Sequence, residues 1–220
     1  METKVLIGIP TAEVARSGYF YDHFNALEKP VGTVCTFARG QSPARNRNMI
    51  IEQMFAYDCT HILFLDDDVT FNPDLLNRLL AHDVDMVTGL YLMRNYPHSP
   101  IIFDHADELG RCITCWSKQS EGLVEIVAAG LGACLIKREV FEKMEKPWIR
   151  LGELESDQWC DDLGFFKRAR EAGFKLFCDM SVCVGHIASV MIYPSFREGA
   201  WHIVYDTKGP TSVSFPRPQP

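Results

Sequence analysis

Residues 61–69 read HILFLDDDV, a short apolar run that leads directly into three consecutive aspartates. An apolar run of this length is typical of a strand buried on both faces of a sheet. Adjacent carboxylates repel one another, and a divalent cation is a natural compensating charge because hard cations prefer carboxylate oxygens. Ligands of open α/β sheets bind beyond the carboxyl ends of the strands, where these aspartates would lie. The alternative interpretation is a solvated loop in which Asp68 or Asn72 caps the next helix.

Strand-like and helix-like segments alternate on both sides of this stretch. Strands are expected at 4–9, 31–37 and 84–90, where β-branched and other apolar residues form short runs. Ser42-Pro43 supplies an N-cap and a first-turn proline for one helix, and Asn72-Pro73-Asp74 begins another. This alternation predicts an α/β fold with a mostly parallel central sheet flanked by helices.

The second half of the chain follows a different pattern. Between 97 and 136, short strand-like runs and glycine-containing turns predict a small antiparallel strand patch. Beyond it we expect helices near 138–145 and over 161–172, and strands at 174–178 and 182–184. The antiparallel patch would therefore be inserted into the α/β body.

The composition limits the class of protein. The chain has 220 residues, 47% of them apolar and 23% charged, with a formal charge of −7. These values exclude a disordered or collagen-like chain, and no apolar run approaches the roughly 20 residues of a membrane helix. Without the architecture of a signal peptide, the eight cysteines, Cys112 and Cys115 among them, are expected as reduced thiols. Residues 1–206 are expected to form one domain, and residues 207–220, rich in Pro and Ser, a mobile tail or lid.

Two further features carry polar groups suited to chemistry. Asp161 and Asp162 open a predicted helix, where the helix macrodipole alone would favour acidic residues. The alternative is that a carboxylate of this pair faces the first aspartate cluster and removes a proton from an acceptor hydroxyl. His186 follows the last predicted strands and is either a structural hydrogen-bonding group or a ligand of the same cation as the aspartates.

Taken together, these motifs carry a resemblance to a known family. The chain has an apolar strand ending in D-x-D, an acidic pair opening a helix of the form D-D-x-x-F-x-x-R-x-x-x-x-G, and a later histidine. In this order they resemble the GT-A fold glycosyltransferases, in particular the small family 2-like enzymes of bacteria and phages. The resemblance covers residues 4 to about 188. D-x-D alone is a weak signal, whereas the ordered set is more specific.

The resemblance implies a metal site and a donor site at the first cluster. Asp66 would contact the ribose of a nucleotide-sugar, and Asp67 would belong to the same donor-binding set. Asp68 and His186, with Asp66, would hold Mn²⁺ or Mg²⁺, which would bridge the diphosphate of the donor. The family therefore implies a metal-dependent enzyme.

It also implies a catalytic role for the acidic pair. Asp162 would be the general base, and Asp161 stands beside it in the catalytic motif. The family carries Glu-Asp where this chain has Asp161-Asp162, and a further acid where it has Gly164. These departures weaken the match to the family motif at Asp161 more than at Asp162. Attack of the acceptor from the face opposite the leaving group would invert the anomeric centre.

Three other segments match the donor-binding parts of the family. Pro10, Thr11 and Glu13 follow the first strand and resemble the loop that binds the nucleobase. Arg45, in Ala44-Arg45-Asn46, resembles an arginine that reaches toward the nucleotide. Gly132 belongs to a glycine-containing turn that would let the donor sugar approach the backbone.

The function expected from this resemblance is metal-dependent, inverting transfer of a sugar from a nucleoside-diphosphate donor, with a UDP-sugar favoured, to an acceptor hydroxyl. The acceptor would be a glycan, a lipid-linked group, a small molecule or a modified DNA base. The net charge of −7 argues against broad binding of a nucleic-acid backbone. We expect a cytoplasmic protein of a bacterium or a phage-infected host, and the oligomeric state stays open.

Other classes of protein remain as alternatives. Asp66-x-Asp68-x-Thr70 after an apolar strand also matches the nucleophile motif of HAD-type phosphohydrolases, although two strands and a helix precede it here. A nucleotidyltransferase that makes sugar nucleotides would carry a Gly- and Arg-rich loop after its first strand, and residues 8–13 lack one. A non-catalytic binding module would have to use both acidic clusters as scaffold.

Overall fold

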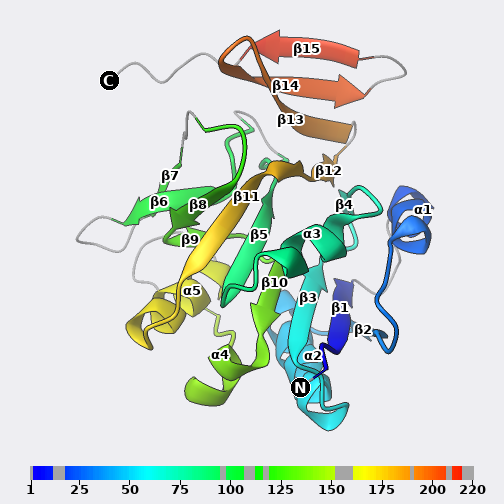
Figure 1. The fold of residues 1–220 in the computed structure, drawn as a ribbon, viewed down its shortest axis with the longest axis vertical. Helices are drawn as coiled ribbons and strands as arrows, with labels where there is room; N and C mark the ends of the chain where they lie inside the picture. The colour runs from blue at the N-terminus through cyan, green and yellow to red at the C-terminus, as the bar shows by residue number, and fades with distance from the viewer. Residues whose placement is uncertain are drawn as a thin grey trace.

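The computed structural model describes residues 2–11, 18–94, 98–106, 112–115, 119–151, 161–188, 191–206 and 210–214. Within these ranges the main sheet has seven strands in the order β2-β1-β3-β10-β5-β11-β8 (Figure 1). The bounds of its strands are β1 Val5–Thr11, β2 Val34–Arg39, β3 His61–Leu65, β5 Met86–Leu90, β8 Leu123–Ile126, β10 Ala133–Lys137 and β11 Leu176–Cys183.

The main sheet is mixed but mostly parallel. Strand β1 pairs in parallel with β2 and β3, and β5 pairs in parallel with β11. Strand β10 lies antiparallel between β3 and β5, and β8 is antiparallel to β11 at the edge. The predicted α/β class with a mostly parallel sheet is confirmed.

Helices cover both faces of this sheet. Their bounds are α1 Gly18–Ala26, α2 Pro43–Ala56, α3 Leu75–Ala81, α4 Arg138–Lys143 and α5 Asp161–Glu171. Buried apolar residues of α2, α4 and α5 pack in one core cluster with the sheet, and those of α1 and α3 pack in another. Because side chains alternate along a strand, Leu6 belongs to the first cluster and Ile7 to the second. The helix starting at Pro43 is confirmed with its predicted cap, since the Ser42 hydroxyl accepts a hydrogen bond from the Arg45 amide.

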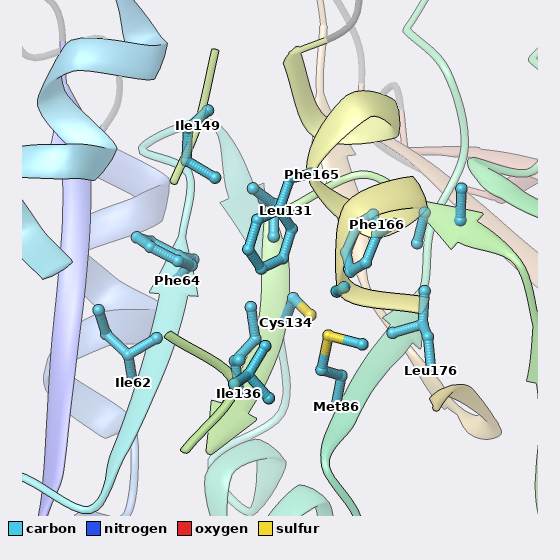
Figure 2. Packing of buried hydrophobic residues seen from close by; sticks show 14 of the residues in the cluster. Ile62, Phe64, Met86, Leu131, Cys134, Ile136, Ile149, Phe165, Phe166 and Leu176 are labelled. Atoms are coloured by element: carbon cyan, nitrogen blue, oxygen red, sulfur yellow. The ribbon is translucent and has the colours of Figure 1, made fainter. Parts of the chain in front are cut away.

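The larger core joins α5 to the middle of the sheet. Figure 2 shows Phe165 and Phe166 of α5 packed over side chains of β3, β5, β10 and β11. The labelled sheet residues there are Ile62, Phe64, Met86, Cys134, Ile136 and Leu176. Both phenylalanines are fully buried and make an edge-to-face contact, which anchors the start of α5, where the acidic pair lies.

The middle of the chain differs from the prediction in one respect. A three-stranded antiparallel sheet, β7-β6-β9, is present as expected, with bounds Cys112–Thr114, Ile102–Ala106 and Ala128–Ala129. However, the runs around 124–127 and 133–136 join the main sheet as β8 and β10. Short apolar runs have no feature that selects one sheet over another, so only tertiary pairing decides their partners.

A second sheet was not foreseen from the sequence. It has the order β15-β14-β13-β12-β4, and Figure 1 shows β13, β14 and β15 at one end of the molecule. The bounds are β4 Val69–Thr70, β12 Gly185–Ile187, β13 Met191–Arg197, β14 Ala200–Asp206 and β15 Pro210–Ser214. The segment expected as an irregular tail thus contributes a strand, and its role as a lid stays a prediction. Among the described helices, none is long and apolar enough to span a membrane.

Candidate active site

A pocket of about 460 Å³ lies where β1 and β3 end, at the carboxyl edge of the parallel strands. Acidic and basic side chains face each other across it. The described residues that line it are Pro10, Thr11, Gln41, Pro43, Asn46, Arg47, Asp66, Asp67, Asp68, Arg94 and Asp161. Four of these eleven residues are aspartates and two are arginines. The pocket therefore presents groups of both signs, arginines suited to an anionic ligand and carboxylates suited to a cation.

The three consecutive aspartates take three different positions at the end of β3. Asp66 Oδ1 accepts a hydrogen bond from Arg47 at 2.9 Å, and the Asp66 amide donates to the Gly132 carbonyl. Asp67 accepts from the hydroxyl of Thr11, at the end of β1. Asp68 Oδ2 lies 2.9 Å from Arg94 Nη1. Each carboxylate therefore has its own partner, which is how the fold accommodates three adjacent negative charges.

Arg47 is the buried centre of this charge network. Its side chain is only 6% exposed and donates to both Asp66 and Asp162 at 2.9 Å, with Asp161 Oδ2 at 3.9 Å. Burial lowers the pKa of Arg47, but the carboxylates of Asp162, Asp66 and Asp161 outweigh it and place that pKa above the ordinary range. Arg47 thus ties the two acidic clusters of the sequence together.

Asp162 is the more enclosed residue of the pair that opens α5. Its Oδ1 accepts from Arg47, and its Oδ2 accepts from the Leu131 amide at 3.0 Å. Burial raises the pKa of the Asp162 carboxyl to about 6, with further upward contributions from Asp161 and Asp66, against the opposing effect of Arg47. Burial likewise raises the pKa of Asp66, although Arg47 lowers it.

Asp161 lines the pocket and has a different environment. Its Oδ2 is buried and has no hydrogen-bond partner among the described residues, although it lies near Arg47. A buried acceptor without a donor is uncommon in proteins and is often a site of function. Asp161 is therefore the member of the pair that lines the pocket, and its buried oxygen lies beside Arg47 without a hydrogen bond.

The second sheet brings His186 to the aspartates. Strand β12 pairs with β4 so that His186 lies opposite Val69, and the Ile187 amide donates to the Asp68 carbonyl at 2.7 Å. A Cβ on Gly185 would overlap the side chains of Thr70 and Tyr193, so this close approach requires glycine. His186 Nδ1 lies 2.7 Å from the Leu92 carbonyl, which can only accept, so Nδ1 carries a proton. In the neutral ring, Nε2 then holds a lone pair, 3.7 Å from Asp68 Oδ1.

Asp68 and His186 are the two described side chains that could hold a divalent cation together. Within the described ranges, no three His, Cys, Asp or Glu side chains converge on one point. Asp68 and His186 fit as a pair, because an oriented imidazole nitrogen and a carboxylate oxygen are ordinary ligands. Asp66, the third ligand expected from the sequence, has one oxygen held by Arg47. Mg²⁺ commonly takes one or two protein ligands and completes its shell with phosphate oxygens and water.

Gly132 packs closely against Asp66 and Tyr91, and its expected role toward the donor sugar stays a prediction. It is buried, and a Cβ there would lie 3.0 Å from both Asp66 Oδ2 and the Tyr91 hydroxyl. The Tyr91 hydroxyl accepts from the Gly132 amide at 3.0 Å, and burial raises the pKa of Tyr91 well above its usual value. A Cβ on Gly130 would overlap the same hydroxyl. The two glycines therefore make room for Tyr91 and Asp66.

The predicted site residues are only partly brought together. Pro10, Thr11, Asp66, Asp67, Asp68 and Asp161 line the pocket. Asp162, His186 and Gly132 contact lining residues from behind. Arg45 is exposed and instead lines a neighbouring groove with Trp148 and Leu151. Glu13 lies outside the described residues.

Sequence reasoning missed two important arginines. Arg47 lies three, four and seven positions before Ile50, Ile51 and Met54, which places it on the buried face of α2. A charged residue at such a position could have been recognised from the sequence as a candidate site residue. Arg94 follows the end of β5 by four residues, where ligand contacts are common in α/β sheets, but its neighbours carry no motif.

Comparison with known proteins gives similarity of fold. A197 from STIV matches with a TM-score of 0.58 and 19% identity, over 96% of this chain and 94% of that chain. S. aureus TarS 1-349 matches with a TM-score of 0.47 and 14% identity, over 80% of this chain and 58% of that chain. The same protein in complex with UDP-GlcNAc matches with a TM-score of 0.45 and 14% identity, over 80% and 56%. No family model and no curated protein matches the sequence.

Proposed function

We propose that this protein is a metal-dependent, inverting glycosyltransferase that moves a sugar from a nucleoside-diphosphate donor to an acceptor hydroxyl. The observation that carries the proposal is the pocket at the carboxyl edge of the sheet, where two acidic clusters far apart in the sequence meet around Arg47. The aspartates of both clusters are also among the residues that carry the resemblance to GT-A fold glycosyltransferases.

The donor would lie across the ends of β1 and β3. The nucleoside would occupy the side formed by Pro10, Thr11 and Gln41, and the diphosphate the side formed by Asp68 and Arg94. Asp68 and His186 would hold Mn²⁺ or Mg²⁺. When bound, the ion would act as a Lewis acid that stabilises the charge developing on the leaving diphosphate. UDP is the favoured nucleotide because it is the commonest in the family that the motifs resemble.

The pocket geometry favours Asp161 as the general base, in place of Asp162. An acceptor hydroxyl has a high pKa and needs a carboxylate within hydrogen-bond reach to take its proton. Asp161 lines the pocket, whereas Asp162 does not and both of its oxygens already accept hydrogen bonds. Asp162 would then act as a positioning residue that holds Arg47 and the loop at Leu131.

A ligand panel tests this function directly. Thermal unfolding is measured with UDP-, GDP-, CDP- and TDP-sugars, each with Mn²⁺ and with a chelator. A ligand at 100 times its Kd stabilises by about 2.7 kcal/mol, and for a domain of this size each kcal/mol raises the Tm by about 2–4 °C. We therefore expect a shift of about 5–10 °C for one nucleotide-sugar, in Mn²⁺ only.

Two results would argue for another class of protein. If no nucleotide-sugar shifts the Tm in either condition, the donor assignment is wrong. If an aryl phosphate traps a phosphoryl group on Asp66, the chain is a phosphohydrolase instead. Release of free sugar from a nucleotide-sugar would not count against the proposal, because water can replace the acceptor in such enzymes.

A further inference from the structure

The two arginines of the pocket are paired with aspartates in different ways. Arg47 is held on α2, its side chain is 6% exposed, and it bonds two carboxylates at once. Arg94 has a side chain that is 42% exposed, and its ion pair within the described residues is with Asp68, whose side chain is 12% exposed. Breaking an ion pair costs less when the cation regains water than when both groups are buried, provided that another cation takes its place at the enclosed carboxylate. Arg94 is therefore the arginine that can leave its carboxylate.

The backbone that carries Arg94 is fixed on its N-terminal side. The Met93 amide donates to the Ser99 carbonyl at 2.9 Å, and the Ile101 amide donates to the Tyr91 carbonyl at 2.9 Å. The Leu92 carbonyl also lies 2.7 Å from His186 Nδ1. Arg94 thus extends a long side chain over the pocket from an anchored position, so its guanidinium can change partners while its backbone stays in place.

Arg94 lies beside the carboxylate that also faces His186. Its Nη1 lies 2.9 Å from Asp68 Oδ2, and the other oxygen of the same carboxylate faces His186 Nε2 at 3.7 Å. The guanidinium therefore supplies positive charge to the very carboxylate that, with His186, fits a divalent cation. A cation on Asp68 would make this ion pair redundant, since Asp68 would no longer need it.

We propose that Arg94 stands in for the divalent cation at Asp68 in the ligand-free protein and moves to the phosphate oxygens of the donor when the cation binds. This inference rests on the proposed function. The guanidinium fork matches phosphate geometry, and its hydrogen bonds to phosphate are charge-assisted. The exchange keeps Asp68 paired with a cation in both states. Arg94 is then a positioning residue for the diphosphate and a competitor of the metal.

These two roles predict effects of opposite sign for Arg94→Ala. Without nucleotide, the variant should bind Mn²⁺ about two- to five-fold more tightly, the range expected when an exposed ion pair no longer competes. With saturating Mn²⁺, it should bind UDP at least about ten-fold more weakly, because a charge-assisted bond to phosphate is lost. Arg94→Lys, which keeps the charge but not the fork, should fall between the two proteins in both measurements.

The experiment uses the full chain. Free Mn²⁺ is counted by its paramagnetic resonance signal in titrations of the wild type, Arg94→Ala, Arg94→Lys and Asp68→Asn, and UDP binding is measured by calorimetry. Asp68→Asn should weaken Mn²⁺ binding and so identify the site. Lys175→Ala is the matched control, since Lys175 pairs with Glu125 outside the pocket. It should leave both affinities unchanged.

Every other pattern overturns the inference. If Arg94→Ala weakens both Mn²⁺ and UDP, Arg94 only supports the structure of the site. If Mn²⁺ affinity is unchanged, or if neither protein binds Mn²⁺ without nucleotide, Arg94 does not compete with a cation. These outcomes leave the proposed function standing as long as a nucleotide-sugar still binds, whereas loss of all nucleotide-sugar binding by the wild type contradicts the function itself.

Discussion

Arg47→Met is the change that tests most directly whether one buried guanidinium joins the two acidic clusters. Arg47 donates to Asp66 and Asp162 at 2.9 Å and is 6% exposed, so its removal leaves the buried Asp162 and the half-buried Asp66 without their cation. Hydrogen bonds to charged groups contribute about 1.5–3 kcal/mol each, and removing one partner of a buried pair costs about 3–5 kcal/mol. We expect the free energy of unfolding at pH 7 to fall by about 4 kcal/mol.

The pH dependence of this loss has a definite sign. The pKa of Asp162 is already raised to about 6, above the value of about 3.9 in an unfolded chain, and Arg47 holds it lower than it would otherwise be. A raised carboxyl pKa means that the folded state keeps a proton that the unfolded state has lost, so stability falls as the pH rises through the folded pKa. Without Arg47 this pKa rises further, and the deficit of Arg47→Met should be smaller at pH 5 than at pH 7.

Urea unfolding of Arg47→Met and the wild type at pH 5 and pH 7 measures both effects. Arg45→Met is the matched control, because Arg45 lies two residues away on the same helix but is exposed. Surface substitutions usually change stability by less than about 0.5 kcal/mol. A deficit below about 1 kcal/mol at pH 7, or a larger deficit at pH 5, would refute the electrostatic reasoning.

Three further predictions concern single positions. Asp161→Asn should lower turnover at least about 100-fold with donor affinity unchanged, whereas Asp162→Asn should mainly lower the Tm. If steady-state kinetics show the large loss of turnover for Asp162→Asn instead, Asp162 is the general base. His186→Ala should abolish the effect of Mn²⁺ on donor binding in calorimetry, and an unchanged metal dependence would remove His186 from the metal site. Gly130→Ala should destabilise by about 1–3 kcal/mol, and Tyr91→Phe should restore part of that loss, since the added Cβ would overlap the Tyr91 hydroxyl; no rescue in urea unfolding would contradict this contact.

Local pattern was sufficient for most of the main sheet and its helices. The apolar run before Asp66 forms β3, the Ser42-Pro43 signal begins α2, and the leucines after Asp74 form α3. Period and capping are properties of a few neighbouring residues, so they can be recognised in one sequence. Helix α1, over 18–26, was not predicted, although Phe20 and Phe24 pack against the same core cluster.

The candidate site was predictable where it depends on a strand end and not where it depends on contacts between distant residues. Placement of the aspartates at the edge of the sheet follows from β3 ending at Leu65. The choice between Asp161 and Asp162 does not follow from their order, because it depends on which carboxylate Arg47 and the Leu131 amide enclose. Arg45 and Arg47 differ in the same way, since their direction depends on the face of α2 that packs against the sheet.

The sequence by itself determined the α/β class and the two acidic clusters, because hydrophobic period and strand ends are local features of the chain. Only the tertiary structure decided that β10 and β8 join the main sheet, that β12 carries His186 to Asp68, and that Arg47 pairs with Asp66 while Arg94 pairs with Asp68. Pairing of strands and of buried charges links residues many positions apart. Such pairing depends on the shape of the whole folded chain, and no short stretch of sequence contains it.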